Sequence, residues 1–141
     1  MDFKDFHIGS LINRRVAECG IEISRICNFL PCSAESVEKM YQSKSLNTQT
    51  LLRWSKLLEY DFFRIYSQHL VLYSPVSSIK VIPTLRKKKS SLPSFRKNLY
   101  TKEIIDFVLE RISSNEMTKT QVIKRYRIPK TTLYKWLSKY S

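Results

Sequence analysis

The sequence predicts an all-α protein of two small helical domains joined by a basic linker. Only 2 glycines and 5 prolines occur among 141 residues, which favours helices over a turn-rich β fold. Apolar residues recur at helical spacing from about residue 8 to 70 and again from 101 to 140. Between them, the composition of residues 71–99 is that of a linker. The expected domains are therefore residues 5–70 and 100–141, with 71–99 as the linker.

Five helices are expected in the first domain. The first has an apolar stripe from Ile8 to Val16 and ends at Gly20, a residue type common at helix C-termini. The others follow from apolar spacing and from residues that cap helix N-termini. They are Ile23–Leu30, a helix capped by Ser33, a helix capped by Asn47 or Thr48 that ends near Leu58, and a short helix capped by Asp61 that runs to Tyr66.

Three helices are expected in the second domain. Thr101 can cap a helix whose apolar side extends to Ile112. Thr118 and Gln121 then have the T-x-x-Q spacing of a capping box, which predicts the next helix start. Pro129 opens the last helix, because its missing N–H is not needed at that position.

The charge predicts a polyanionic partner. The chain has 25 basic and 12 acidic residues, a net charge of +13. Residues 1–70 contribute only +1, whereas 71–99 contribute +7 and 100–141 contribute +5. Such an excess is typical of proteins that bind DNA, RNA or an anionic membrane surface. The alternative is a cationic protein with no specific partner.

The end of the second domain resembles a helix-turn-helix. Residues 128–137 read Ile-Pro-Lys-Thr-Thr-Leu-Tyr-Lys-Trp-Leu. This segment is similar to the helix-turn-helix of insertion-sequence transposases and homeodomain-like bacterial DNA-binding proteins, although Pro129 stands where a serine cap is common. The resemblance implies that the last helix enters the major groove of double-stranded DNA.

The expected DNA contacts follow from the chemistry of these side chains. Lysine donates hydrogen bonds to guanine, and threonine can bond a base or touch a thymine methyl group. From residue 117 to 141 there are seven basic residues and no acidic one. We expect bases to be read by Lys130, Thr131, Thr132 and Lys135. We expect phosphates to be bound by Lys119, Lys124, Arg125, Arg127, Tyr134, Lys139 and, from the linker, Arg86, Lys87, Lys88 and Lys89. For the linker, a solvated spacer is an equal alternative.

The first domain resembles the five-helix fold of lambda-repressor-like proteins. The step Gly20-Ile21, the Ser33 cap and the leucine-rich residues 51–58 support the resemblance. Ile23 and Pro31 depart from it, because the family usually has a glutamine and a glycine there. The expected recognition helix also carries two glutamates, which repel phosphate. DNA contact and docking of a second copy or of another protein are therefore equal alternatives. The DNA contacts would be Ser33, Ser36, Lys39, Gln42 and Lys44.

The sequence does not indicate an enzyme or a metalloprotein. The three cysteines and two histidines lack zinc-binding spacing, so neither a metal nor a cofactor is expected. No glycine-rich phosphate loop, nucleophile elbow or carboxylate cluster on strands is present in the sequence. No signal peptide opens the chain, and no apolar run approaches about 18 residues, so a cytoplasmic protein is expected.

Together these observations predict a sequence-specific double-stranded DNA-binding protein. It would be a transcriptional regulator or the DNA-recognition component of a transposable element. The alternative is an adaptor whose first half docks a protein partner while the basic half binds nucleic acid non-specifically. RNA binding ranks lower, because the stacking surfaces of RNA-binding modules are absent from the sequence.

Overall fold

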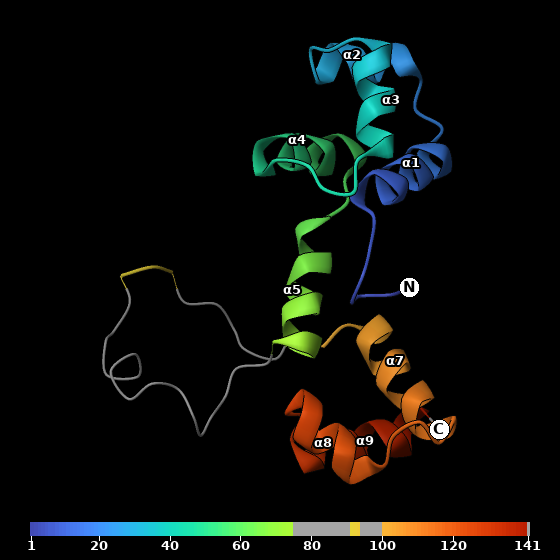
Figure 1. Ribbon diagram of the computed structural model, residues 1–141, viewed down its shortest axis with the longest axis vertical. Helices are drawn as coiled ribbons and strands as arrows, with labels where there is room; N and C mark the ends of the chain where they lie inside the picture. Colours follow the sequence, from blue (N-terminus) through green and yellow to red (C-terminus); the bar gives the residue numbers. More distant parts are fainter. Residues whose placement is uncertain (75–90, 94–99, 141) are drawn as a thin grey trace. The chain divides into compact units, whose positions relative to one another are not determined.

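The computed structural model describes residues 1–74, 91–93 and 100–140, and within them it consists of helices without any strand (Figure 1). The expected all-α class is confirmed. Contacts divide the chain into a first unit, Met1–Ser67, and a second unit, Gln68–Ser141, which are described separately below. No helix in the described part of the chain is both long and apolar enough to cross a membrane.

The first unit contains α1 to α4 and the start of α5. Their bounds are α1 Ile8–Cys19, α2 Ile23–Phe29, α3 Ala34–Gln42, α4 Thr48–Leu58 and α5 Phe63–Tyr73. Three expected caps are confirmed. Gly20 ends α1 in the left-handed conformation, with φ 66°. The Ser33 side chain caps α3 by accepting the Ser36 N–H, and Asn47 caps α4 in the same way.

The start of α1 packs directly on the end of α3. The Gly9 N–H donates to the Ser43 carbonyl at 2.9 Å, and the Ile8 N–H donates to the Lys44 carbonyl at 3.0 Å. A Cβ atom on Gly9 would lie 2.3 Å from the Met40 carbonyl oxygen. Such a contact is too short for any side chain, so only glycine allows the two helices to approach this closely.

An apolar core lies between these helices. Its members Ile8, Ile12, Ile26, Val37, Leu51, Trp54 and Leu58 are at most 2 % exposed. One expectation for this core is wrong. Ile23 was expected on the buried side of α2, but it is 47 % exposed because it is the first residue of a short helix. Ile26 and Leu30 bury that side of the helix instead.

Helix α5 extends to Tyr73, beyond the expected end near Tyr66. The first three residues of the expected linker are thus helical. Leu72 explains the extension, because it is 2 % exposed and therefore stabilises the last turn by burial. The rest of that linker, residues 75–90 and 94–99, lies outside the described residues, and so do Arg86, Lys87, Lys88 and Lys89.

The second unit contains the end of α5 and the helices α7 Lys102–Ser113, α8 Lys119–Tyr126 and α9 Lys130–Tyr140. Ile104, Val108, Val122, Ile128 and Leu133 form its core and are at most 2 % exposed. Helix α9 begins one residue later than expected. The Pro129 carbonyl accepts the first helical hydrogen bond, from the Leu133 N–H at 3.0 Å, so Pro129 occupies the N-cap position.

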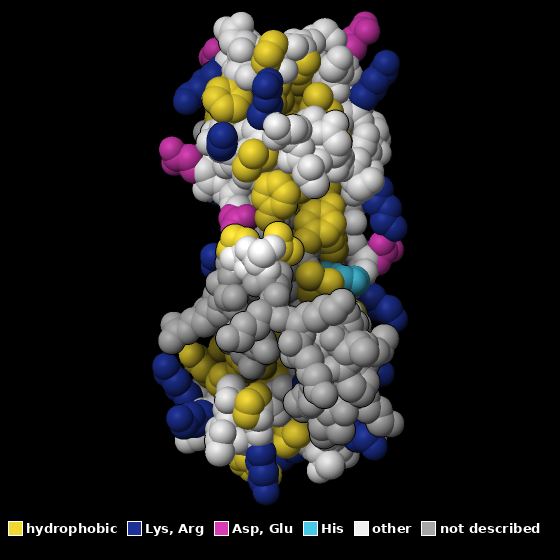
Figure 2. Space-filling model, turned by 90° about the vertical axis from the view of Figure 1, so that its left-hand side faces the viewer, with side chains coloured by type: hydrophobic (Ala, Val, Ile, Leu, Met, Phe, Trp, Pro, Cys, Tyr) yellow, Lys and Arg dark blue, Asp and Glu magenta, His cyan; other side chains and the backbone are white. Residues whose placement is uncertain are grey.

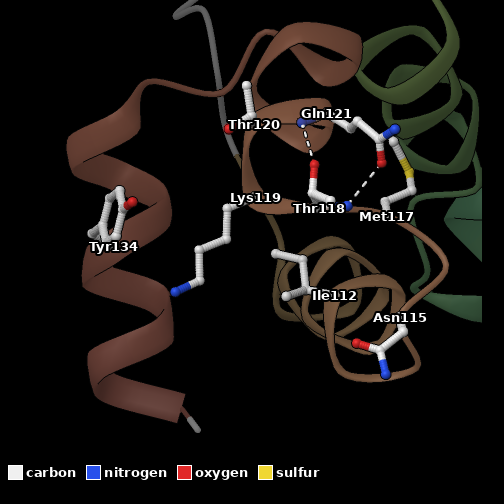
Figure 3. A pocket seen from close by; sticks show the side chains of 8 residues that line it. All are labelled: Ile112, Asn115, Met117, Thr118, Lys119, Thr120, Gln121 and Tyr134. Carbon is white, nitrogen blue, oxygen red and sulfur yellow. Dashed lines mark hydrogen bonds between the residues drawn. The ribbon is translucent and has the colours of Figure 1, made fainter.

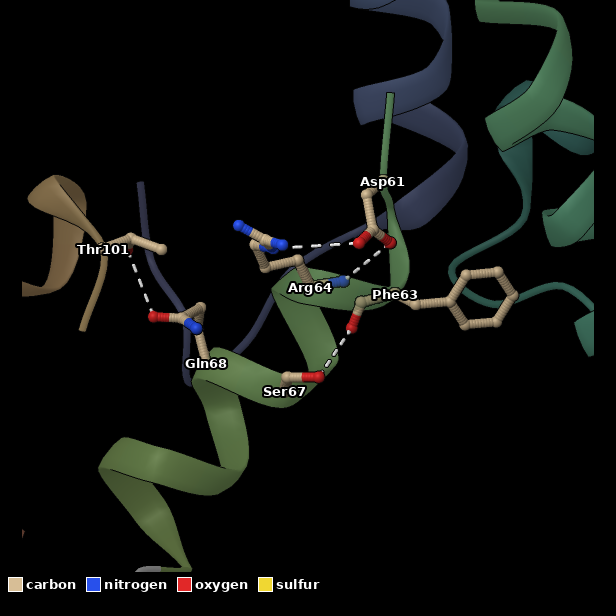
Figure 4. A network of polar contacts seen from close by, with 6 residues as sticks. All are labelled: Asp61, Phe63, Arg64, Ser67, Gln68 and Thr101. Carbon is tan, nitrogen blue, oxygen red and sulfur yellow. Dashed lines mark hydrogen bonds and ion pairs between the residues drawn. The ribbon is translucent and has the colours of Figure 1, made fainter. Parts of the chain in front are cut away.

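A buried hydrogen bond joins α5 to the start of α7 within the second unit. The Thr101 hydroxyl donates to the side-chain oxygen of Gln68 at 3.1 Å, and Gln68 is 4 % exposed (Figure 4). Thr101 occupies the N-cap position of α7, as expected, but its side chain makes no capping bond. The hydroxyl instead satisfies an amide oxygen that would otherwise be costly to bury.

Candidate nucleic-acid interface

Helices α8 and α9 are connected by the tight turn Arg127-Ile128-Pro129. Arg127 adopts the left-handed conformation, with φ 54° and ψ 40°, and ends α8. Ile128 is 2 % exposed and so anchors the turn in the core of the second unit. The two short helices are therefore joined by a turn of three residues whose middle residue is fixed by burial.

The expected capping box at the start of α8 is present. The Gln121 N–H donates to the Thr118 hydroxyl oxygen at 3.2 Å. In return, the Thr118 N–H donates to the Gln121 side-chain oxygen at 2.9 Å (Figure 3). The two bonds fix the point at which α8 begins and therefore the position of its first residues relative to α9.

One side of α9 is buried and the opposite side is exposed. Leu133 and Trp136 point into the core, and the Trp136 and Tyr100 rings form a T-shaped pair with centroids 5.0 Å apart. Burial raises the pKa of Tyr100. The exposed residues on the opposite side, which we call the outer face of α9, are Lys130, Thr131, Tyr134, Lys135, Ser138 and Lys139. Tyr140 was expected to pack on the earlier helices, but it is 44 % exposed because it is the last residue of the helix.

The four expected base readers do not point in one direction. Each residue of an α-helix is rotated by about 100° from the one before it. Thr131 and Lys135 are four residues apart and thus lie together on the outer face. Lys130 and Thr132 lie at opposite edges of that face, and Thr132 is half-buried.

The surface around this face is basic. Lysine and arginine side chains project from the surface in the lower part of Figure 2, where α8 and α9 lie in Figure 1. The described part of the chain contains no ion pair of a basic residue on α8, on α9 or in the turn between them. The expected phosphate-binding residues Lys119, Lys124, Arg125, Arg127, Tyr134 and Lys139 are all exposed.

The acidic residues of the second unit lie elsewhere. Glu103, Asp106 and Glu110 are on α7, and Glu116 is in the loop after it. Glu116 pairs with Arg111 and raises the pKa of that guanidinium through their hydrogen bond. No acidic residue therefore lies on α8, on α9 or in the turn between them, and Glu116 precedes Lys119 by three residues.

Two lysines converge on Tyr134 beside an open groove. The Lys119 Nζ lies 5.5 Å from the centroid of the tyrosine ring, and the Lys130 Nζ lies 5.7 Å from it. The groove is lined by Tyr134, Lys119 and the capping-box residues, among others (Figure 3). The i, i+4 spacing of Lys130 and Tyr134 is a signal in the sequence. The contact of Lys119 depends on how α8 packs on α9, and sequence reasoning missed it.

The corresponding helix pair of the first unit, α2 and α3, has a different surface. The side chains of Ser33 and Ser36 contact each other at 3.1 Å, and Ser33 is used as the cap of α3. Lys39 and Gln42 are exposed, but α3 also exposes the two glutamates Glu35 and Glu38.

Lys44, another expected DNA contact of the first unit, pairs with Asp5 at 2.6 Å. Its hydrogen bond lowers the pKa of the Asp5 carboxyl group. A lysine already paired with a carboxylate is less available to phosphate.

The histidines and cysteines do not gather into a ligand set in the described residues. No group of three or more metal-ligating side chains occurs there. His7 instead caps α1, because its Nδ1 atom accepts the Ser10 N–H at 3.1 Å, a role that sequence reasoning missed. Cys32 is a free thiol whose pKa is raised by burial and by the neighbouring Cys27.

Comparisons with protein-family models, with curated proteins and with solved structures found no match to this chain.

Proposed function

We propose that this chain is a sequence-specific double-stranded DNA-binding protein in which α8 and α9 form a helix-turn-helix. The outer face of α9 carries the proposal, because it exposes Thr131 and Lys135 among basic neighbours while Leu133 and Trp136 hold the opposite side in the core. From residue 117 to 141 no acidic residue opposes the approach of a phosphate backbone.

In this proposal α9 lies in the major groove. Thr131 and Lys135 read base edges, with Lys130 and Thr132 at the borders of the same surface. The exposed basic residues of α8 and the turn bind phosphates and release counterions, which supplies affinity without sequence preference. Such a protein serves as a transcriptional regulator or as the DNA-recognition component of a transposable element, as the resemblance to transposase helix-turn-helix segments suggests.

A selection from a random duplex library with the full chain tests this function. We expect one enriched motif, which the double variant Thr131→Ala, Lys135→Ala loses. Lys56→Ala is a matched control, because it removes one exposed positive charge from α4 in the first unit and should leave the motif unchanged. Equal recovery of all duplexes by the unaltered protein would contradict sequence-specific binding.

A second candidate function is that of an adaptor whose first unit docks a protein. Three large apolar side chains of this unit favour it, since Ile23, Phe29 and Leu52 are 47 %, 43 % and 39 % exposed. Where such groups form a contiguous patch, they mark a site of protein association. In this case the library yields no motif, and Phe29→Ser lowers self-association measured by sedimentation velocity. A monomeric chain with a clear motif would contradict this candidate.

A further inference from the structure

We propose that Lys119, Lys130 and Tyr134 form a clamp for a single phosphate group of a nucleic-acid backbone. The inference rests on the proposed DNA-binding function and gives Lys130 a more specific role in it. Its basis is that two ammonium groups, one from the first residue of α8 and one from the first residue of α9, lie within 5.7 Å of the centroid of the same tyrosine ring.

The arrangement favours an anion between the two lysines. Two like charges held near one ring repel each other, although the negative face of the ring attracts both. No ion pair in the described part of the chain includes either lysine. A phosphate group that accepts hydrogen bonds from both ammonium groups would neutralise this repulsion.

The surroundings leave room for such a group. Tyr134 is 44 % exposed, and its side chain borders the open groove between the start of α8 and α9. Figure 3 shows the Lys119 side chain extending from the start of α8 toward α9, the helix that carries Tyr134. A phosphodiester running past α9 would enter this groove from the solvent side.

The same geometry separates Lys130 from the base readers. Lys130 lies at the edge of the outer face of α9, and its ammonium group lies over the Tyr134 ring, as that of Lys119 does. Thr131 and Lys135 lie closer to the centre of that face. Lys130 is therefore assigned to the backbone, and base preference is assigned to Thr131 and Lys135.

The salt dependence of duplex binding by the full chain tests whether the lysines share one phosphate. For B-DNA, the slope of log K against log salt changes by about 0.9 for each phosphate neutralised. This slope is negative, and the double variant Lys119→Ala, Lys130→Ala should reduce its magnitude by about 0.9. Each single variant should reduce the magnitude by less. The selected motif should stay the same. The double variant Lys56→Ala, Lys102→Ala is the control, since it removes the same charge from exposed positions outside the cluster.

Three outcomes of these experiments would overturn the clamp. A fall of about 1.8 in the double variant would mean that the lysines bind separate phosphates. A changed motif in Lys130→Ala, or an unchanged slope in the double variant, would mean that Lys130 does not bind the backbone with Lys119.

Tyr134 is a positioning residue in this proposal, and its ring rather than its hydroxyl group holds the lysines. Tyr134→Phe should therefore keep the salt slope, whereas Tyr134→Ala should lower it. In the free protein, ring-current shifts of the Lys119 and Lys130 side-chain protons should persist in Tyr134→Phe and disappear in Tyr134→Ala. Equal salt slopes for Tyr134→Ala and the unaltered protein would contradict the role.

A final arm separates failure of the clamp from failure of the proposed function. If the chain binds no duplex, the proposed function is wrong, and the chain is then titrated with inorganic pyrophosphate and followed by NMR. Shifts confined to residues near Lys119, Lys130 and Tyr134 would support a phosphate site of another source. An absence of such shifts would overturn the clamp as well.

Discussion

The helix pairs α2–α3 and α8–α9 share their local construction but differ in surface charge. In each pair the second helix starts after a short turn. A side-chain cap fixes the start of one helix in each pair, at Ser33 for α3, the second helix of its pair, and at Thr118 for α8, the first helix of its pair. Helix α3 exposes Glu35 and Glu38, whereas α9 exposes no acidic residue. Packing and partner choice therefore depend on different residues. Buried residues decide how helices pack, and exposed charges decide which partner the packed helices accept.

The turns of the two pairs also differ. Leu30, which ends α2, is buried and is followed by Pro31, so that turn offers a phosphate no positive charge. The turn after α8 contains Arg127 and follows Lys124 and Arg125 on the helix, all three of them exposed. In the proposed function, DNA binding therefore belongs to the second unit, and the first unit serves as the reference for it.

The largest loss of stability is expected from a substitution in the core of the second unit. Leu133 is fully buried, so Leu133→Ala should reduce the free energy of unfolding by about 2–5 kcal/mol. Urea titration followed by the indole N–H signals of Trp136 and Trp54 reports on one unit each. Thr131→Ala is the control, because Thr131 is exposed on the same helix. An equal shift for both variants would mean that α9 does not pack as described.

The next largest loss of stability is expected from a substitution in the first unit. Gly9→Ala should cost about 2–3 kcal/mol, because the new Cβ would meet the backbone carbonyls of Met40, Tyr41 and Ser43 and force α1 away from α3. Gly20→Ala is the matched control. No atom lies within 4 Å of a Cβ built there, so only its positive φ is unfavourable, at about 1 kcal/mol. The Trp54 indole signal during urea titration measures both changes. A smaller loss for Gly9→Ala than for Gly20→Ala would contradict the close packing.

These two glycines illustrate how far sequence reasoning reaches. The role of Gly20 was predictable, because it follows an apolar stripe and helix ends are local features. Local signals also predicted the caps at Ser33, Asn47 and Thr118. The role of Gly9 was not predictable, since the carbonyls that it contacts belong to a helix about 30 residues further along the chain.

The same limit applies to the candidate interface. Helical spacing predicted the buried side of α9 at Leu133 and Trp136, but it wrongly placed Tyr140, the last residue of the helix, on that side, where it is 44 % exposed. The spacing also places Lys130 and Thr132 on different edges. The position of Lys119 over Tyr134 depends on the packing of α8 against α9. This packing cannot be deduced from residue spacing within one helix. Likewise, the side-chain oxygen of the buried Gln68 accepts a hydrogen bond from the Thr101 hydroxyl. The two residues are far apart in the sequence, so no local pattern predicts this bond.

A charge reversal on each helix tests the comparison directly. Lys135→Glu places a negative charge at the centre of the outer face of α9, and we expect duplex affinity to fall at least tenfold, or about 1.4 kcal/mol. Lys39→Glu makes the same change on α3 and should alter affinity by less than about threefold. Fluorescence anisotropy with the selected duplex measures both. A larger effect at Lys39 would move the DNA-binding surface to the first unit.

The smallest effects are expected from the helix caps Thr118 and Ser33. Thr118 takes part in two capping hydrogen bonds with Gln121, whereas the Ser33 side chain accepts one backbone N–H. Thr118→Ala and Ser33→Ala each remove one bond to a backbone N–H, because the second bond of the capping box is donated by the Thr118 backbone N–H and remains. Each variant should therefore cost about 1 kcal/mol, measured by urea denaturation. Because Lys119 directly follows Thr118, fraying of this turn should also weaken duplex binding slightly in Thr118→Ala, while Ser33→Ala leaves binding unchanged. A binding loss in Ser33→Ala alone would show that the start of α3, despite its glutamates, contributes to DNA recognition.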